Sequence, residues 1–311
     1  MIDIVTALRA EVGRVVRGAD ATVDLLVAAA TLGGHVLLEG PPGVAKTLTA
    51  TALARALDVD DARIQLTPDM LPSDVTGTVA LRGSELVFRP GPVFTNVLIA
   101  DEINRTPPKT QSALLEAMQE GAVTVDGERH PLPVPFLLVA TQNPIEQEGT
   151  YPLPEAQLDR FLFRVRVGYP DETAEREIVS AARDGLRPAA LADVRPVVDA
   201  AALAAARATV QDTFVHADVV EYVVAVVRAT RSQPSVELGA SPRAGLHLLA
   251  AAQASARIAG RDFVTPDDVR AVAEVVLAHR LVLSPEAELE GTRDRDAVAA
   301  ALATVPVPAS R

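Results

Sequence analysis

Short apolar runs alternate with longer stretches of helical periodicity between residues 21 and 169. Apolar runs of this length are typical of strands buried in a parallel sheet, and the stretches between them are typical of helices that cover its two faces. The pattern therefore predicts an α/β domain built on a parallel five-stranded sheet. The predicted strands cover residues 35–39, 63–66, 97–100, 137–141 and 161–167.

Two further segments of this domain have the pattern of β-hairpins inserted into the core. Residues 78–88 alternate in polarity on either side of Arg82-Gly83, and residues 123–129 flank Asp126-Gly127. Asp-Gly is a favoured two-residue hairpin turn because both of its positions accept positive φ. We expect both hairpins to project from the sheet.

Beyond Pro170 the strand pattern ends, and Ala, Val, Leu and Arg follow a helical period to about residue 283. Two helix starts, Ser241-Pro242 and Thr265-Pro266, combine an N-cap hydroxyl with proline at the first helical position. This predicts a smaller all-helical domain. The chain then divides into an α/β domain (1–170), an all-helical domain (171–285) and a C-terminal tail (286–311) that is loosely held at its end.

Residues 40–47 have the sequence Gly-Pro-Pro-Gly-Val-Ala-Lys-Thr, between a predicted strand and an Ala/Leu-rich helical stretch. Only two of the 29 basic residues are lysine, Lys46 and Lys109. A chain this rich in arginine keeps a lysine where a compact ammonium must fit between phosphate oxygens. The segment predicts a nucleotide phosphate-binding loop, and a plain glycine-proline turn is the alternative. The residues expected to bind the nucleotide are Gly40, Pro41, Pro42, Gly43, Val44, Ala45, Lys46, Thr47 and Leu48.

One position departs from the general pattern of such loops, because Ala45 stands where a glycine is expected before the lysine. A methyl group is tolerated there only if the residue avoids positive φ.

The apolar run at 97–100 ends in two adjacent carboxylates, Asp101 and Glu102. After a phosphate loop this is a Walker B arrangement, in which Asp101 and the Thr47 hydroxyl hold Mg²⁺ and Glu102 polarises water against the γ-phosphate. An acidic helix N-terminus is the alternative. Asn143, after the next apolar run, is placed to contact the γ-phosphate or the attacking water, although Asn-Pro is also a common turn. The predicted cofactors are ATP and Mg²⁺.

Four other segments support the phosphate loop: Ala-Asp-Glu-Ile-Asn-Arg (100–105), Ala-Leu-Leu-Glu-Ala-Met (113–118), Ala-Thr-Gln-Asn-Pro (140–144) and Tyr-Pro-Leu-Pro-Glu-Ala-Gln-Leu-Asp-Arg-Phe (151–161). With these motifs the chain resembles the AAA+ ATPases, and within them the MoxR family, over roughly residues 10–280. In that family an alanine before the lysine is usual. The resemblance implies a P-loop AAA+ core followed by a helical lid, in a hexameric ring that holds ATP between neighbouring subunits.

Two arginines match family positions. Arg160 matches the arginine finger that reaches into the next subunit's site, whereas the residues alone favour an ion pair with Asp159 or Glu155. Arg243 matches the sensor 2 arginine of the lid. A cation in the first turn of a helix also opposes the helix dipole, so an anion such as ATP is expected nearby, and a solvated surface arginine is the alternative.

Further residues and segments also match the family, but the resemblance implies less about their roles. Gly18 matches the segment that lines the adenine pocket, but Arg17 stands where the family usually has an apolar residue. Asn104 and Arg105 match a family motif connected with subunit contacts. The two hairpins correspond to insertions that face the pore or a partner. The family implies chaperone-like remodelling or maturation of a protein client, such as metal or cofactor insertion, with a partner that carries a von Willebrand factor A domain.

Composition bears on which functions are compatible with this core. The net charge of −12 and 3% aromatic residues disfavour nucleic-acid binding, which argues against a nucleic-acid motor built on the same fold. A nucleotide-sensing scaffold without turnover also remains open, but Glu102 together with Arg160 disfavours it. A small-molecule kinase is the remaining alternative, but it would not need a trans arginine or a helical lid of this length. The chain lacks cysteine, a signal-peptide pattern and any apolar run long enough to span a bilayer, so we expect a cytoplasmic protein without membrane insertion.

Overall fold

The computed structural model describes residues 1–144, 149–181 and 191–308. The chain forms two compact units. The first, here called the sheet unit, comprises Ile4–Leu153 and Val165–Leu203. The second, here called the helical unit, comprises Met1–Asp3, Pro154–Arg164 and Ala204–Arg311.

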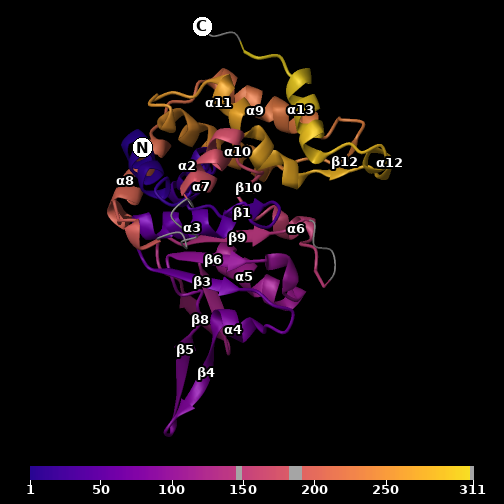
Figure 1. Cartoon of the computed structure of the whole chain (residues 1–311). Coiled ribbons are helices and arrows are strands. Elements are labelled where there is room, and N and C mark those ends of the chain that lie inside the picture. The colour runs from indigo at the N-terminus through magenta and orange to yellow at the C-terminus, as the bar shows by residue number, and fades with distance from the viewer. Residues whose placement is uncertain (145–148, 182–190, 309–311) are drawn as a thin grey trace. The chain divides into compact units, whose positions relative to one another are not determined.

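A five-stranded sheet organises the nucleotide-binding fold, in the order β10-β1-β9-β6-β3 (Figure 1). The parallel pairings of β1 with β9 and of β9 with β6 join strands that are apolar and buried along most of their length, whereas β3, which pairs in parallel with β6 at the edge of the sheet, buries only Ile64. The predicted sheet is confirmed. Its strands are β1 (Val36–Glu39), β3 (Asp61–Gln65), β6 (Val97–Asp101), β9 (Leu137–Gln142) and β10 (Phe163–Arg166).

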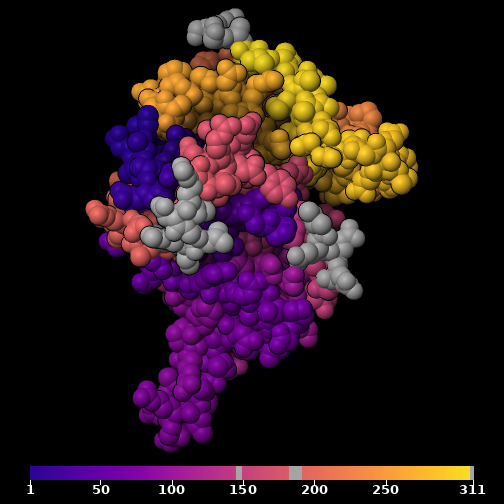
Figure 2. Space-filling model, viewed as in Figure 1, coloured from indigo at the N-terminus to yellow at the C-terminus, as the bar shows by residue number. Residues whose placement is uncertain are grey.

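Both predicted hairpins are present, formed by β4 (Gly77–Arg82) with β5 (Glu85–Pro90) and by β7 (Ala122–Val125) with β8 (Glu128–Pro131). Asp126 and Gly127 hold the positive φ values, 49° and 82°, that the two-residue turn requires. The β4–β5 hairpin extends away from the sheet as a narrow projection (Figures 1 and 2). The rings of Phe88 and His130 stack at 3.9 Å between centroids and so join the two hairpins at their bases.

Helices of the sheet unit pack around this core, and α3 lies against β6 and β9. Helix α5 shows how sequence sets their limits, because it begins with Pro108 at its first turn and ends at Gly121 in the left-handed conformation. The elements are α1 (Ile2–Val12), α2 (Asp20–Leu32), α3 (Lys46–Ala56), α4 (Pro72–Thr76), η1 (Ile103–Arg105), α5 (Pro108–Glu120), α7 (Glu172–Ala181), η2 (Leu191–Asp193), and the paired strands β2 (Leu57–Asp58) and β11 (Val198–Asp199).

The helical unit is built mainly on α10 and α11, which pack along each other. Both begin where expected, with proline after Ser241 and after Thr265. The elements are α6 (Glu155–Leu158), α8 (Ala200–Gln211), α9 (Ala217–Thr230), α10 (Pro242–Ile258), α11 (Pro266–Leu277), η3 (Ala278–Arg280), α12 (Pro285–Leu289), α13 (Asp294–Thr304), and the antiparallel strands β12 (Val236–Leu238) and β13 (Val282–Leu283).

Two features of this unit differ from the expected pattern. The β12–β13 pair is too short for an alternating pattern to reveal it in a helix-rich sequence. Residues 294–304, assigned above to the tail, form α13, which buries Ala297, Val298 and Ala301 and packs against α9 and α11. Residues 309–311, the end of that tail, lie outside the described residues. Across the described ranges, no helix has both the length and the apolar character needed to cross a bilayer.

Candidate active site

The glycine-rich loop links the end of β1 to the start of α3, and the backbone geometry at two of its positions requires glycine. A Cβ on Gly40 would lie 2.1 Å from the carbonyl oxygen of Val167, so only glycine fits between the loop and the residue that follows β10. Gly43 has φ of +84°. Ala45 also has positive φ, +61°, so the condition that its methyl group avoid this region is not met. The residue holds a strained backbone at the start of α3, which costs about 1 kcal/mol or more.

Lys46 begins α3 and turns its ammonium back over the loop. Nζ donates to the carbonyl oxygens of Gly40 at 2.6 Å and Pro41 at 2.7 Å. The backbone N–H groups of the loop and the first turn of α3 make a ready-made anion site, so the lysine brings a compact positive charge to a place that favours phosphate.

Asp101 ends β6 beside this loop and is only 3% exposed. Its Oδ1 accepts from the Thr47 hydroxyl at 2.6 Å and from the Thr141 hydroxyl at 3.1 Å, while Oδ2 accepts from Arg63 Nε at 2.7 Å. The structure thus brings together Thr47 and Asp101, the two residues predicted to hold a metal. Hydroxyl and carboxylate oxygens suit Mg²⁺, which takes few protein ligands and completes its shell with water and phosphate.

Glu102 follows at once and has a left-handed backbone, with φ of +59°. Its Oε2 accepts from Gln65 Nε2 at 2.8 Å and lies 2.9 Å from Arg105 Nε. Its backbone N–H donates to the Thr141 hydroxyl at 3.1 Å, so one threonine fixes both adjacent acids. The positive φ turns Glu102 out of the strand path while Asp101 stays buried.

The remaining predicted residues of the sheet unit take defined places. Asn143 directly follows β9 and is 6% exposed, and Gly40 N–H donates to the carbonyl oxygen of Gln142 at 3.2 Å. Asn143, the loop, Asp101 and Glu102 therefore gather at the carboxyl ends of neighbouring parallel strands, where α/β folds bind ligands. Gly18 has φ of +71°, and a Cβ there would lie 3.1 Å from that of Ala174, so the segment packs closely on α7.

Arg160 and Arg243 both belong to the helical unit. Arg160 lies two residues beyond the end of α6. Its neighbour Asp159 accepts from Arg280 Nε at 2.7 Å, so this carboxylate forms an ion pair with Arg280. Arg243 is exposed in the first turn of α10, whose N-cap Ser241 makes no side-chain capping bond.

Sequence reasoning missed three side chains that contact the two acids, Arg63, Gln65 and Thr141, and it named Arg105 without its contact with Glu102. A signal existed for two of them. Arg63 and Gln65 are polar residues two positions apart on a strand otherwise predicted as buried, so both point to one face of the sheet at its ligand-binding edge.

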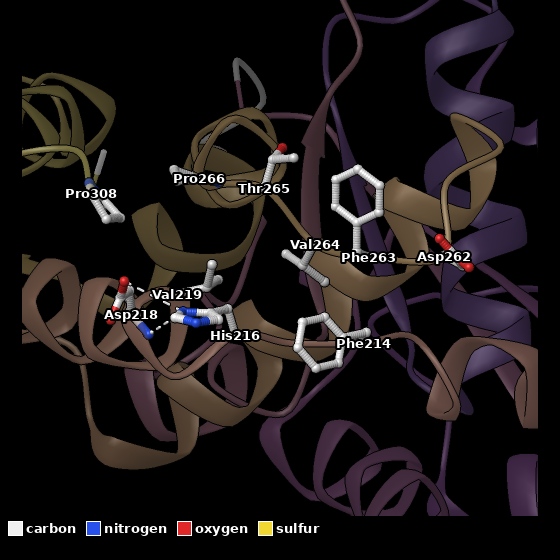
Figure 3. Close-up of a pocket in the computed structure, with 10 residues that line it drawn as sticks. All are labelled: Phe214, His216, Asp218, Val219, Asp262, Phe263, Val264, Thr265, Pro266 and Pro308. Carbon is white, nitrogen blue, oxygen red and sulfur yellow. Dashed lines mark hydrogen bonds and ion pairs between the residues drawn. The ribbon is translucent and has the colours of Figure 1, made fainter. Parts of the chain in front are cut away.

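The helical unit also contains a pocket of about 530 Å³, whose lining includes none of the predicted site residues (Figure 3). Phe214 and Phe263 lie side by side in a parallel bridge, and Asp218 and Asp262 are also among the residues that line the pocket. It is therefore an apolar pocket with acidic groups, distinct from the phosphate loop in the sheet unit.

The loop lysine, the buried acid bonded to a helix-start hydroxyl, and the parallel sheet define a P-loop ATPase core. Two family matches agree with this class. Residues 35–163 match the ATPase family associated with various cellular activities (AAA), and residues 228–301 match the AAA lid domain.

Similar proteins identify the family within this class of ATPases. The chain is 47% identical to the uncharacterized protein YeaC of Bacillus subtilis, over 96% of this chain and 93% of that protein. It is 45% identical to the chaperone MoxR1 of Mycobacterium tuberculosis, over 96% of this chain and 81% of that protein. A solved structure of a protein from Cytophaga hutchinsonii has a TM-score of 0.89 and 39% identity, covering 99% of this chain and 96% of that one. The chain belongs to the MoxR family of AAA+ ATPases.

Proposed function

We propose that this ATPase hydrolyses ATP with Mg²⁺ in a hexameric ring whose neighbouring subunits share each site, and couples turnover to remodelling a protein client. The observation that carries the ATP site is the 2.6 Å bond between the Thr47 hydroxyl and Asp101, formed beside Lys46 in the phosphate loop. The cytoplasm, where ATP is abundant, is the compartment we propose for it.

Each predicted site residue of the sheet unit then has a role in binding or hydrolysing ATP. Lys46 and the loop N–H groups bind the β- and γ-phosphates, Thr47 and Asp101 hold Mg²⁺, and Asn143 contacts the γ-phosphate or the attacking water. Gly18 lies in the segment that lines the adenine pocket. The metal, when bound, neutralises charge on the phosphates. Glu102 orients and polarises the water, and its contacts with Gln65 and Arg105 hold the carboxylate until substrate is present.

The proposal also gives roles to Arg160, to Arg243 and to a protein client. Arg160 acts as an arginine finger in the next subunit's site, and Arg243 acts as the sensor 2 arginine of the lid. The named relative MoxR1 is a chaperone, which supports client remodelling or maturation, such as metal or cofactor insertion. A von Willebrand factor A domain protein is the partner we propose, with the projecting β4–β5 hairpin as one surface available for contact.

Lysine substitutions test nucleotide binding. Lys46→Ala removes the ammonium beside the phosphates and is expected to weaken binding of a fluorescent ATP analogue by about tenfold to a hundredfold. Lys109→Ala is the matched control, because Lys109 is the other lysine of the chain and is exposed on α5. Equal affinity of both variants for the analogue would remove the phosphate-loop assignment.

A substitution of the proposed base tests hydrolysis separately. Glu102→Gln keeps the size of the side chain and is expected to bind ATP normally while phosphate release falls by about a hundredfold or more. Glu172→Gln, on the exposed face of α7, is the matched control. Normal phosphate release by the Glu102→Gln protein contradicts the role given to this residue.

A further inference from the structure

Arg280, at the end of η3, carries a guanidinium that is almost fully buried, with 1% of its side chain exposed. Nε donates to Asp159 Oδ1 at 2.7 Å, and Nη2 donates to the carbonyl oxygens of Asp159 at 3.0 Å and Phe161 at 2.7 Å. These bonds hold the residues on both sides of Arg160. A buried charge is costly unless it is paired and bonded, so the conformation of this segment is closely specified by one side chain.

The same guanidinium also reaches α10. Nη2, whose two hydrogens are shared among its three acceptors, also donates to Nδ1 of His247 at 2.7 Å. His247 lies four positions after Arg243, and residues at this spacing share one face of a helix. Burial, with the charges of Arg280 and Arg243, lowers the pKa of His247 to about 4, so the neutral imidazole keeps the lone pair that accepts this bond.

We propose that Arg280 is a positioning residue for ATP turnover, which fixes the segment carrying Arg160 against the helix face carrying Arg243. This inference rests on the proposed function, in which both arginines act on ATP. All five residues of the network, Asp159, Arg160, Arg243, His247 and Arg280, belong to the helical unit, so the two arginines are held in one body. A displacement of about 1 Å in a catalytic group can cost about a hundredfold in rate, which is why such a fixed arrangement matters.

Arginine is required for this role because its planar fork presents five donors in fixed directions, whereas lysine is a point charge. Lysine at position 280 can retain an ion pair with Asp159 but cannot also reach Phe161 and His247. Arg280→Lys is therefore expected to lower kcat for ATP by about tenfold to a hundredfold, with the KM for ATP changed by less than about threefold.

The matched control is Arg261→Lys. Arg261 also pairs with a buried carboxylate in the helical unit, at 2.6 Å from Asp268 Oδ1, but its bonds hold the start of α11 instead of the segment that carries Arg160. It is expected to lower the unfolding temperature and leave kcat within about twofold of wild type. An equal loss of kcat in both variants would mean that the rate follows the stability of the unit, and the inference would be overturned.

His247 gives a second pair of variants if Arg280→Lys does not fold. His247→Leu removes the acceptor and is expected to lower kcat by about tenfold, whereas His247→Asn places an amide oxygen near the position of Nδ1 and recovers most of that rate. Wild-type kcat in His247→Leu, measured by phosphate release at saturating ATP, also overturns the inference.

Failure of the inference and failure of the proposed function have different signatures. If Arg160→Ala retains full turnover while Arg280→Lys loses it, Arg280 does not act through Arg160 and the inference fails, but the ATPase assignment stands. If Lys46→Ala and Glu102→Gln also retain full turnover, the proposed ATP site itself is wrong.

Discussion

Ala45 and Glu102 both hold non-glycine backbones at positive φ, 61° and 59°, within the candidate site. Each such residue costs about 1–3 kcal/mol and persists only where its surroundings hold it. Ala45 is held by the first turn of α3, where its carbonyl oxygen accepts from the N–H and the hydroxyl of Thr49 at 2.8 and 2.9 Å. Glu102 is held through Thr141. Both strained residues therefore lie within the candidate site and are held by bonds with threonine side chains.

His35 provides a residue-scale prediction of acid sensitivity. Its Nδ1 accepts from Leu138 N–H at 3.0 Å, so Nε2 carries the proton and donates to the carbonyl oxygen of Met118 at 3.1 Å. Burial lowers the pKa of His35 from 6.5 to about 4. Between these values the unfolded chain binds more protons, so stability that is complete above pH 6.5 is lost as the pH falls toward 4.

The loss from His35 amounts to about 3 kcal/mol over that range. Urea unfolding at several pH values measures it, and His35→Gln is expected to flatten the dependence only in part, because burial lowers the pKa of His247 and His279 as well. The same pH dependence in wild type and His35→Gln would contradict the assignment.

At the residue scale, motif spacing predicted which groups of the site meet but not their conformations. Thr47 and Asp101 lie together as expected, because strand order and motif position place both at one sheet edge. The backbone of Ala45 could not be predicted, since its strain is offset by contacts formed only in the folded chain. Arg63 and Gln65 had a signal in the polar pattern of their strand, but their contacts with the two acids depend on β3 pairing beside β6, which a single sequence does not reveal.

At the scale of elements, two helices begin with the same hydroxyl-proline signal but are capped differently. The Thr265 hydroxyl accepts from Asp268 N–H, and the Thr265 backbone N–H donates to Asp268 Oδ2 at 2.8 Å, forming a capping box at α11. Burial raises the pKa of Asp268, but bonds from Arg261 and Thr265 outweigh it, so the pKa is lowered and the acceptor stays charged. Ser241, at α10, makes no side-chain capping bond.

This difference predicts unequal costs for matched substitutions. Thr265→Ala is expected to lower the free energy of unfolding by about 1 kcal/mol because it removes a working cap. Ser241→Ala is expected to cost less than about 0.5 kcal/mol. Urea unfolding of the two variants measures both values, and equal costs would show that the capping box contributes nothing measurable.

Elements with strong local signals were predictable, and short ones were not. The β7–β8 hairpin followed from its Asp-Gly turn, and the sheet followed from its buried apolar runs. By contrast β12 and β13 are set by their pairing with each other, and α13 is stabilised by packing against α9 and α11. Long-range contacts of this kind are absent from any local pattern.

For the whole molecule, the candidate groups divide between two bodies. Lys46, Thr47 and Asp101 lie in the sheet unit, whereas Arg160 and Arg243 lie in the helical unit, to which residues 154–164 also belong. Turnover that needs both sets therefore requires two separately packed bodies to act on one nucleotide. In the proposed ring, with head-to-tail interfaces, the proposed finger Arg160 and the proposed base Glu102 of one active site would come from different subunits.

Mixing two inactive variants tests that shared site. Arg160→Ala subunits keep Glu102, and Glu102→Gln subunits keep Arg160, so a neighbouring pair in the right order rebuilds one complete site. With random exchange at equal amounts, about a quarter of all sites are complete, and phosphate release is expected to recover to about a quarter of the wild-type rate. Arg160→Ala subunits mixed with subunits carrying both substitutions serve as the control, because no order of neighbours completes a site. Absence of recovery at every ratio, with subunit exchange verified by labelled chains, means that Arg160 does not act across an interface.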